Sequence, residues 1–159
     1  MASERGTALG DEFAATNREV MVFARSCSPA QWATVVPGED WSVGVVIHHI
    51  AEGHGNVVRW LEAMAQGEAV SDTQADIDQV NVVHAAHAGA CSVEETLALL
   101  GENGARAEAL LRSLTDEKLD QMAPFGPAGG RSLPTVAVAG AASGHAQEHL
   151  AHARSALGD

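Results

Sequence analysis

The stretch WSVGVVIHHIAEGHGNVVRWLEAMAQG, residues 41–67, carries the pattern that decides the fold. Its apolar side chains recur every three or four residues, which places them on one face of an α-helix. This apolar stripe runs through Val43, Val46/Ile47, Ile50, Val57, Leu61 and Met64. Trp41-Ser42 mark the start of the helix, and Gly67 suits a cap at its C-terminal end. We predict one long amphipathic helix here.

Similar spacing outside this stretch predicts helices over 8–26, 73–88, 92–113 and 132–157. Ser92 and Glu95 fit a capping box, and Ser28-Pro29 opens a short turn through Trp32. A second short turn starts at 113–116, and residues 123–130 break the helical pattern. Four longer helices with short connections indicate an all-α chain, one domain over 1–159, folded as a four-helix bundle.

The charge balance excludes several classes of partner. The 159 residues include 9 Lys and Arg against 21 Asp and Glu, for a net charge of −12. Nucleic acid and anionic membrane surfaces are bound largely through Lys and Arg, so we expect neither as a partner. An aromatic content of 4% is also too low for a base-stacking surface.

Cysteine usage and the start of the chain bear on location. Cys27 and Cys91 are far apart and form no Cys-x-x-Cys pair, so we expect neither a disulfide framework nor a thiolate zinc site. Residues 1–11 lack a basic start followed by an apolar run, and no stretch approaches the roughly 20 apolar residues of a membrane span. We therefore expect a cytoplasmic protein without a signal peptide.

The eight histidines are the unusual feature of the composition. On the last predicted helix the apolar stripe runs through Ala139, Ala142, Ala146, Leu150, Ala153 and Leu157. His145 and His149 share the flank of that stripe, one turn apart, and His152 follows on the same edge. On the helix of residues 41–67, His49 lies at the flank of the stripe and His48 nearly opposite it.

Histidines four residues apart can both reach one ion, and a third ligand from a facing helix leaves a fourth position open, as in catalytic zinc sites. Alternatively, such histidines are inert, hydrogen-bonded side chains between alanine-rich helices. The spacing alone leaves both interpretations open.

Three competing motifs fit the chain less well. His145-Ala-Gln-Glu148-His149 matches the inverted zinc-protease signature, but those larger enzymes need a further ligand well downstream, and only ten residues follow. Glu148 is expected to be solvated. A di-iron bundle needs two Glu-x-x-His motifs, and the chain has none. Gly126–Gly130 lacks the Lys-Ser/Thr of a phosphate-binding loop, and we expect no strand before it.

Other candidate side chains keep more than one interpretation. His84 and His87 extend a stripe with Ile77 and Val80, so they are interface histidines, pocket residues or part of a second site. His48 and His54 are structural or exposed. Trp60 lies on the His49 side of its helix and is either a pocket wall or a core residue.

Several motifs together resemble one family. The chain resembles the DinB/YfiT-like metalloenzymes over nearly its whole length. The resemblance rests on four motifs: Trp41-Ser-Val-Gly followed by His49, the terminal His145-x-x-x-His149-Leu, Asn81 before a Ser-capped helix, and Leu110-Leu-x-x-Leu-x-x-Glu117. Two positions depart from the family: Val45 stands where relatives often have an acidic residue, and His152 where many have Gln. Both departures bear on the substrate.

This resemblance implies a bundle of unusual connectivity, often dimeric, with a divalent ion held by His49, His145 and His149. Zinc and nickel are the expected metals. Further pocket or outer-shell candidates are His152, Trp60, His84 and Asn81.

Several relatives use mycothiol or bacillithiol as S-transferases or as a maleylpyruvate isomerase. The resemblance therefore implies a thiol-dependent transferase or isomerase acting on a small electrophile, because a divalent ion deprotonates a bound thiol. The alternatives are a hydrolase that activates water at the metal and a dimeric bundle that binds a metal or ligand without turnover. A wide pocket would favour an enzyme, whereas a fourth protein ligand such as His152 would favour the binding protein.

Overall fold

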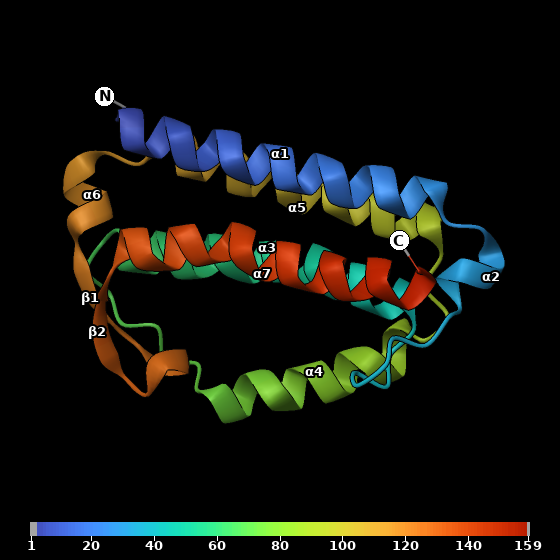
Figure 1. Cartoon of the computed structure of the whole chain (residues 1–159). Helices are drawn as coiled ribbons and strands as arrows, with labels where there is room; N and C mark the ends of the chain where they lie inside the picture. The colour runs from blue at the N-terminus through green and yellow to red at the C-terminus, as the bar shows by residue number, and fades with distance from the viewer. Residues whose placement is uncertain (1–2, 159) are drawn as a thin grey trace.

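Four long helices form a two-layer bundle in the computed structural model, which describes residues 3–158. Helices α1 (Glu4–Ser26) and α5 (Val93–Ser113) form one layer, and α3 (Val43–Met64) and α7 (Thr135–Leu157) form the other (Figure 1). Helix α4 (Gln74–Ala88) lies along the outer face of the second layer and carries the chain back to the end where α3 began. As a result α3 and α5 run in the same direction, which is the unusual connectivity that the family resemblance implied.

Hydroxyl side chains at the N-caps explain where most helices begin. Ser42 accepts a hydrogen bond from the Val45 amide, and Ser92 and Thr73 form capping boxes with the residues three positions later. Such caps satisfy amide groups that lack an intrahelical partner. Ser3 likewise caps α1, which begins four residues earlier than position 8. Short helices α2 (Pro29–Trp32) and α6 (Asp116–Asp120) begin after Ser28 and Thr115, close to the two predicted turns.

The predicted apolar stripes lie in the core. All the stripe positions of α3 are buried, and on α7 only Leu157 is partly exposed. Ile47 and Leu150 pack in one cluster near the C-terminal end of α7, and Phe13, Leu61 and Leu111 pack in a second cluster at the other end. The contact face of α7 is mostly alanine, and small side chains allow two helices to approach closely. This close approach sets the distance between the histidine-bearing faces of α3 and α7.

The segment before α7 differs from the prediction. Residues 132–134 were expected to open the last helix, but β2 (Arg131–Pro134) pairs antiparallel with β1 (Met122–Phe125), and α7 begins at Thr135. The expectation that no strand precedes Gly126 is therefore wrong. Gly129 and Gly130 adopt φ of +70° and +76°, so the chain turns back after the short 3₁₀-helix η1 (Gly126–Ala128). Each strand is only four residues long, too short for a periodic signal.

No helix within residues 3–158 is long and apolar enough to span a lipid bilayer.

His54 occupies a structural position between α3 and the α1–α5 layer. It is 3% exposed, its Nε2 lies 3.1 Å from Asn17 Oδ1, and its ring packs edge-on against Phe13. Asn17 in turn donates to the Leu100 carbonyl oxygen. Burial, with a smaller contribution from His145, lowers the pKa of His54 from 6.5 to about 4. His54 is therefore neutral at pH 7, and its Nε2–H donates a hydrogen bond to Asn17 Oδ1.

This lowered pKa predicts a loss of stability in mild acid. Between pH 6.5 and 4 the unfolded chain binds a proton at His54 that the folded chain does not, so the free energy of unfolding falls as the pH falls. Between pH 7 and 5 the free energy of unfolding of the native protein should fall by about 2 kcal/mol more than that of a His54→Gln variant, because the Gln amide cannot be protonated. Urea unfolding of both proteins at the two pH values measures this difference. Parallel pH dependence in the two proteins would contradict it.

Candidate metal centre

Three histidines from α3 and α7 meet at the boundary between these helices. One ring nitrogen from each of His49, His145 and His149 lies within 4.8 Å of the other two. The ring centroids are 5.0 Å apart for His49 and His149, and 4.5 Å for His145 and His149. The structure thus brings together the three side chains that sequence analysis grouped.

Local sequence explains why these rings converge. His145 and His149 are one turn apart on α7, beside the buried Ala142 and Ala146 that pack toward α3. His49 extends from the facing flank of α3, and the Trp41 ring, just before this helix, packs edge-on against it at 5.2 Å. The alanine face and the Trp41 ring therefore position the cluster without any ligand.

Desolvation and crowding favour the uncharged form of two of the three imidazoles, His49 and His145. Burial and the adjacent His149 and His145 lower the pKa of His49 from 6.5 to about 3. Burial, followed by the adjacent His149, also lowers the pKa of His145. A neutral imidazole keeps a lone pair, which is the form that binds metal ions. Desolvation and crowding thus prepare these side chains as ligands.

Glu39, which sequence analysis did not identify, lies beside the cluster. Its Oε1 is 2.6 Å from Nδ1 of His152 and 3.6 Å from Nδ1 of His149. Nδ1 of His149 is buried and has no hydrogen-bond partner in the described chain. Glu39 lies on the loop before α3, which is held by a hydrogen bond from the Val36 amide to the Trp41 carbonyl oxygen. A loop residue of this kind has no periodicity that would have revealed it.

A cavity of about 700 Å³ opens on the three histidines. Two of the candidate pocket residues, Asn81 and Trp60, line it. The Trp60 ring packs edge-on against Phe125, and its Nε1–H donates a hydrogen bond to Asp72 Oδ2 at 2.8 Å. His84 and His152, the other two candidates, are not among its lining residues. Val45 is 4% exposed and does not line it either.

The remaining histidines separate into buried and exposed positions. His84 is 5% exposed and contacts His48 and Glu52, with its ring 5.6 Å from that of His49. His87 is exposed, although sequence analysis had assigned His84 and His87 to one stripe of α4. Glu148 is exposed, as expected.

The fold and the cluster define a class: an all-α bundle with three histidines at the wall of a cavity. The chain belongs to the DinB superfamily, whose family model matches residues 12–153.

A solved structure shares the whole architecture. YfiT from Bacillus subtilis, described as a probable metal-dependent hydrolase with an unusual four-helix bundle topology, superposes with a TM-score of 0.80. The sequences are 21% identical, and the alignment covers 98% of this chain and 87% of YfiT. At this identity the likeness establishes the fold. Comparison with curated proteins finds no match.

Titration of His49 in the metal-free protein tests the electrostatics of the cluster. Its imidazole signals in two-bond ¹H–¹⁵N spectra should stay unchanged between about pH 8 and 5, because its pKa of about 3 lies below that range. A His49→Gln variant assigns the signals, and free histidine in the same buffer provides the unperturbed reference. A His49 midpoint near 6.5 would overturn the account of His49 as a desolvated, neutral imidazole.

Proposed function

We propose that this protein is a metal-dependent enzyme in which His49, His145 and His149 hold a divalent ion, zinc or nickel, at the wall of the cavity. We further propose that it is a thiol-dependent S-transferase or isomerase that acts on a small electrophile with a thiol of the mycothiol or bacillithiol type. The convergence of three imidazoles on a cavity of about 700 Å³ carries the proposal.

The donor set fits a divalent transition metal. Three imidazole nitrogens leave one coordination position of a tetrahedral ion open, which is the arrangement of catalytic zinc sites. Within residues 3–158, no side chain hydrogen-bonds the ring nitrogens of His49 or His145, so both rings keep a nitrogen for an ion. Nδ1 of His149 lies on the side of Glu39, at 3.6 Å from its Oε1, so the other ring nitrogen is available for the metal.

A divalent ion in this position lowers the pKa of a thiol or a water molecule that binds it. The chain's own residues supply the rest of the site. Trp60 and Phe125 form an apolar wall that excludes water, while the side-chain amides of Asn56 and Asn81 offer hydrogen bonds at the cavity surface. Such walls bind the body of a small molecule and leave its orientation to a few polar groups.

The cavity lining also favours one kind of substrate. No Lys or Arg lines it among the described residues, and the carboxylate of Glu39 does. A dicarboxylate would find no cationic side chain in the lining, and the carboxylate that does not reach the metal would be desolvated without a partner. An uncharged, largely apolar electrophile is therefore a better match than a maleylpyruvate-like acid.

A metal-dependent hydrolase is the second candidate, since YfiT is described as probably being one. The third, a binding protein without turnover, is less well supported. His152 does not line the cavity and its Nδ1 contacts Glu39, so His152 is not placed as a fourth ligand that closes the site.

Elemental analysis tests the metal site. Tag-free protein should lose one equivalent of divalent metal when His49→Ala or His149→Ala is introduced, because each change removes one of three ligands. His87→Ala, a change at an exposed histidine outside the cluster, serves as the matched control and should retain the parent's content. Equal metal content in all four proteins, after incubation with zinc or nickel, would exclude the proposed site.

An activity screen tests the reaction class. With 1-chloro-2,4-dinitrobenzene as the electrophile, thiol addition and loss of chloride should be faster than in the His149→Ala variant by at least about 100-fold, since catalysis by activated nucleophiles typically reaches this range. Mycothiol, bacillithiol and glutathione are compared as thiols, and aryl esters as hydrolase substrates. Ester hydrolysis that requires His149, without any thiol transfer, would assign the second candidate function.

A further inference from the structure

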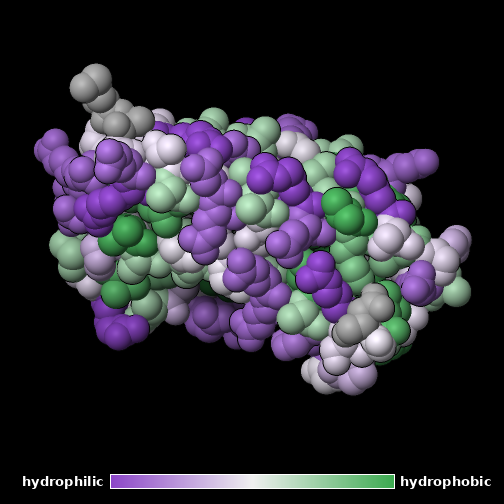
Figure 2. All heavy atoms as spheres, turned by 45° about the horizontal axis from the view of Figure 1, so that its top comes forward, coloured by the Kyte–Doolittle hydropathy of each residue, from purple (hydrophilic) through white to green (hydrophobic). Residues whose placement is uncertain are grey.

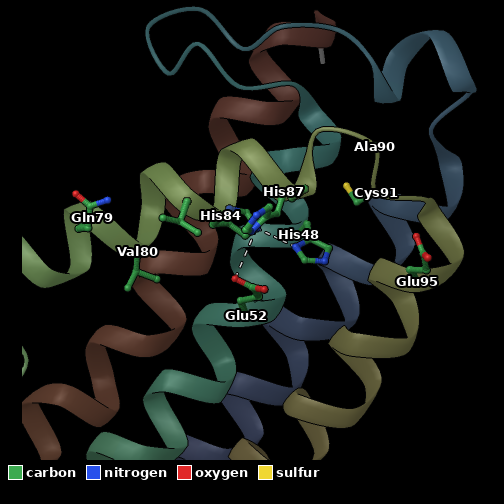
Figure 3. Close-up of a pocket in the computed structure, with 11 residues that line it drawn as sticks. His48, Glu52, Gln79, Val80, His84, His87, Ala90, Cys91 and Glu95 are labelled. Atoms are coloured by element: carbon green, nitrogen blue, oxygen red, sulfur yellow. Dashed lines mark hydrogen bonds and ion pairs between the residues drawn. The ribbon is translucent and has the colours of Figure 1, made fainter.

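A second group of metal-ligating side chains lies outside the three-histidine cluster. His48 and Glu52 from α3 meet His84 from α4, and one ligand atom from each lies within 4.8 Å of the others. His48 Nδ1 is 2.8 Å from His84 Nε2, and that nitrogen is 3.8 Å from Glu52 Oε2. Figure 3 shows the His48 and His84 rings directed toward each other, with the Glu52 carboxylate below them.

The helices explain how these residues meet. His48 and Glu52 are four positions apart, so both side chains lie on the same flank of α3. Helix α4 faces that flank, and His84 and Ala88 are its only buried residues. The apolar side chains near His84 are largely exposed, including Val80 at 54% and Val83 at 44%. A histidine therefore anchors α4 where an apolar residue would be expected.

His84 also carries an unpaired polar atom. Its side chain is 3% exposed, and Nδ1 has no hydrogen-bond partner among the described residues. Burial of a polar group without a partner destabilises a fold. The nitrogen that faces His48 and Glu52 is the other one, Nε2, and the placement of Nε2 against these two side chains is what points to a ligand-binding role.

We propose that His48, Glu52 and His84 form a second binding site for a divalent transition metal of the zinc type, separate from the three-histidine centre. Two imidazoles and one carboxylate are an established zinc donor set. Two ligands of a tetrahedral zinc ion are about 3.4 Å apart, given metal–ligand bonds of about 2.1 Å. The observed separations of 2.8 and 3.8 Å lie on either side of that value, so small side-chain movements admit the ion.

The surroundings suit a cation with an open coordination position. The group lines a cavity of about 680 Å³, which also contains Cys91 and Glu95. Carboxylates of Glu52 and Glu95 and the net charge of −12 attract cations to this surface. The open side of the ion would face this cavity.

The two groups are separable by mutation. The cavity at His84 shares no lining residue with the one at Asn81, and no residue of α7 lines it. Replacing His145 and His149 on α7 therefore removes the first site and leaves the second intact.

Zinc titration in that background tests the proposal. Chelator-treated, tag-free His145→Ala/His149→Ala protein should bind one Zn²⁺ by isothermal titration calorimetry, and Co²⁺ should give the visible absorption of a four-coordinate complex. Removing a residue that only supports a metal ligand weakens metal binding by about 10–100-fold. Adding Glu52→Gln or His84→Gln removes a ligand itself, so either change should weaken Zn²⁺ binding by more than that. Glu52 is 45% exposed, so its variant keeps the fold even if the His84 variant does not.

His87→Gln is the matched control, because His87 lines the same cavity but is outside the group of three. It should bind Zn²⁺ as tightly as its parent. Absence of binding in the His145→Ala/His149→Ala protein, affinity unchanged by Glu52→Gln, or an equal loss with His87→Gln would each overturn the proposed site. Circular dichroism of every metal-free variant confirms that it is folded.

Discussion

Close packing of the alanine face of α7 against the apolar stripe of α3 is the contact on which the rest of the structure depends. Ala142 and Ala146 are buried, and their small side chains bring the two helix axes near each other. Larger residues would move His145 and His149 away from His49 and separate the nitrogens that now lie within 4.8 Å. One packing interface thus forms the core and assembles the cluster, which opens on the cavity. On the surface drawn in Figure 2, hydrophilic side chains are interspersed with hydrophobic ones.

Desolvation of His49 gives this cluster part of its chemical character, while His145 is exposed at its edge. A single exposed imidazole is partly protonated near neutral pH, but three imidazoles packed together disfavour the charged form through desolvation and mutual repulsion. His49 shows both effects, with burial as the larger. The same physics keeps the core residue His54 neutral, where it serves packing and a hydrogen bond instead. Lowered pKa values alone therefore do not identify ligands; convergence on a cavity distinguishes them.

Helical periodicity predicted most of the architecture and the grouping of the three histidines. It could not predict the β1–β2 hairpin, because four-residue strands contain too few alternations and Pro134 resembled a helix start. Periodicity also missed Glu39, which reaches His149 from a loop. Spacing on α4 placed His84 and His87 together, yet only His84 is buried, since α4 contacts the bundle along one narrow edge.

The sequence by itself determined the helices, their caps, their buried faces and the flank on which each histidine lies, because these follow from interactions between residues a few positions apart. Only the tertiary structure decided which flanks face each other. It placed α4 as the crossover, set His84 against His48 and Glu52, and brought Glu39 to His149. These contacts join residues 32 to 110 positions apart, and they depend on how whole helices pack rather than on any local pattern.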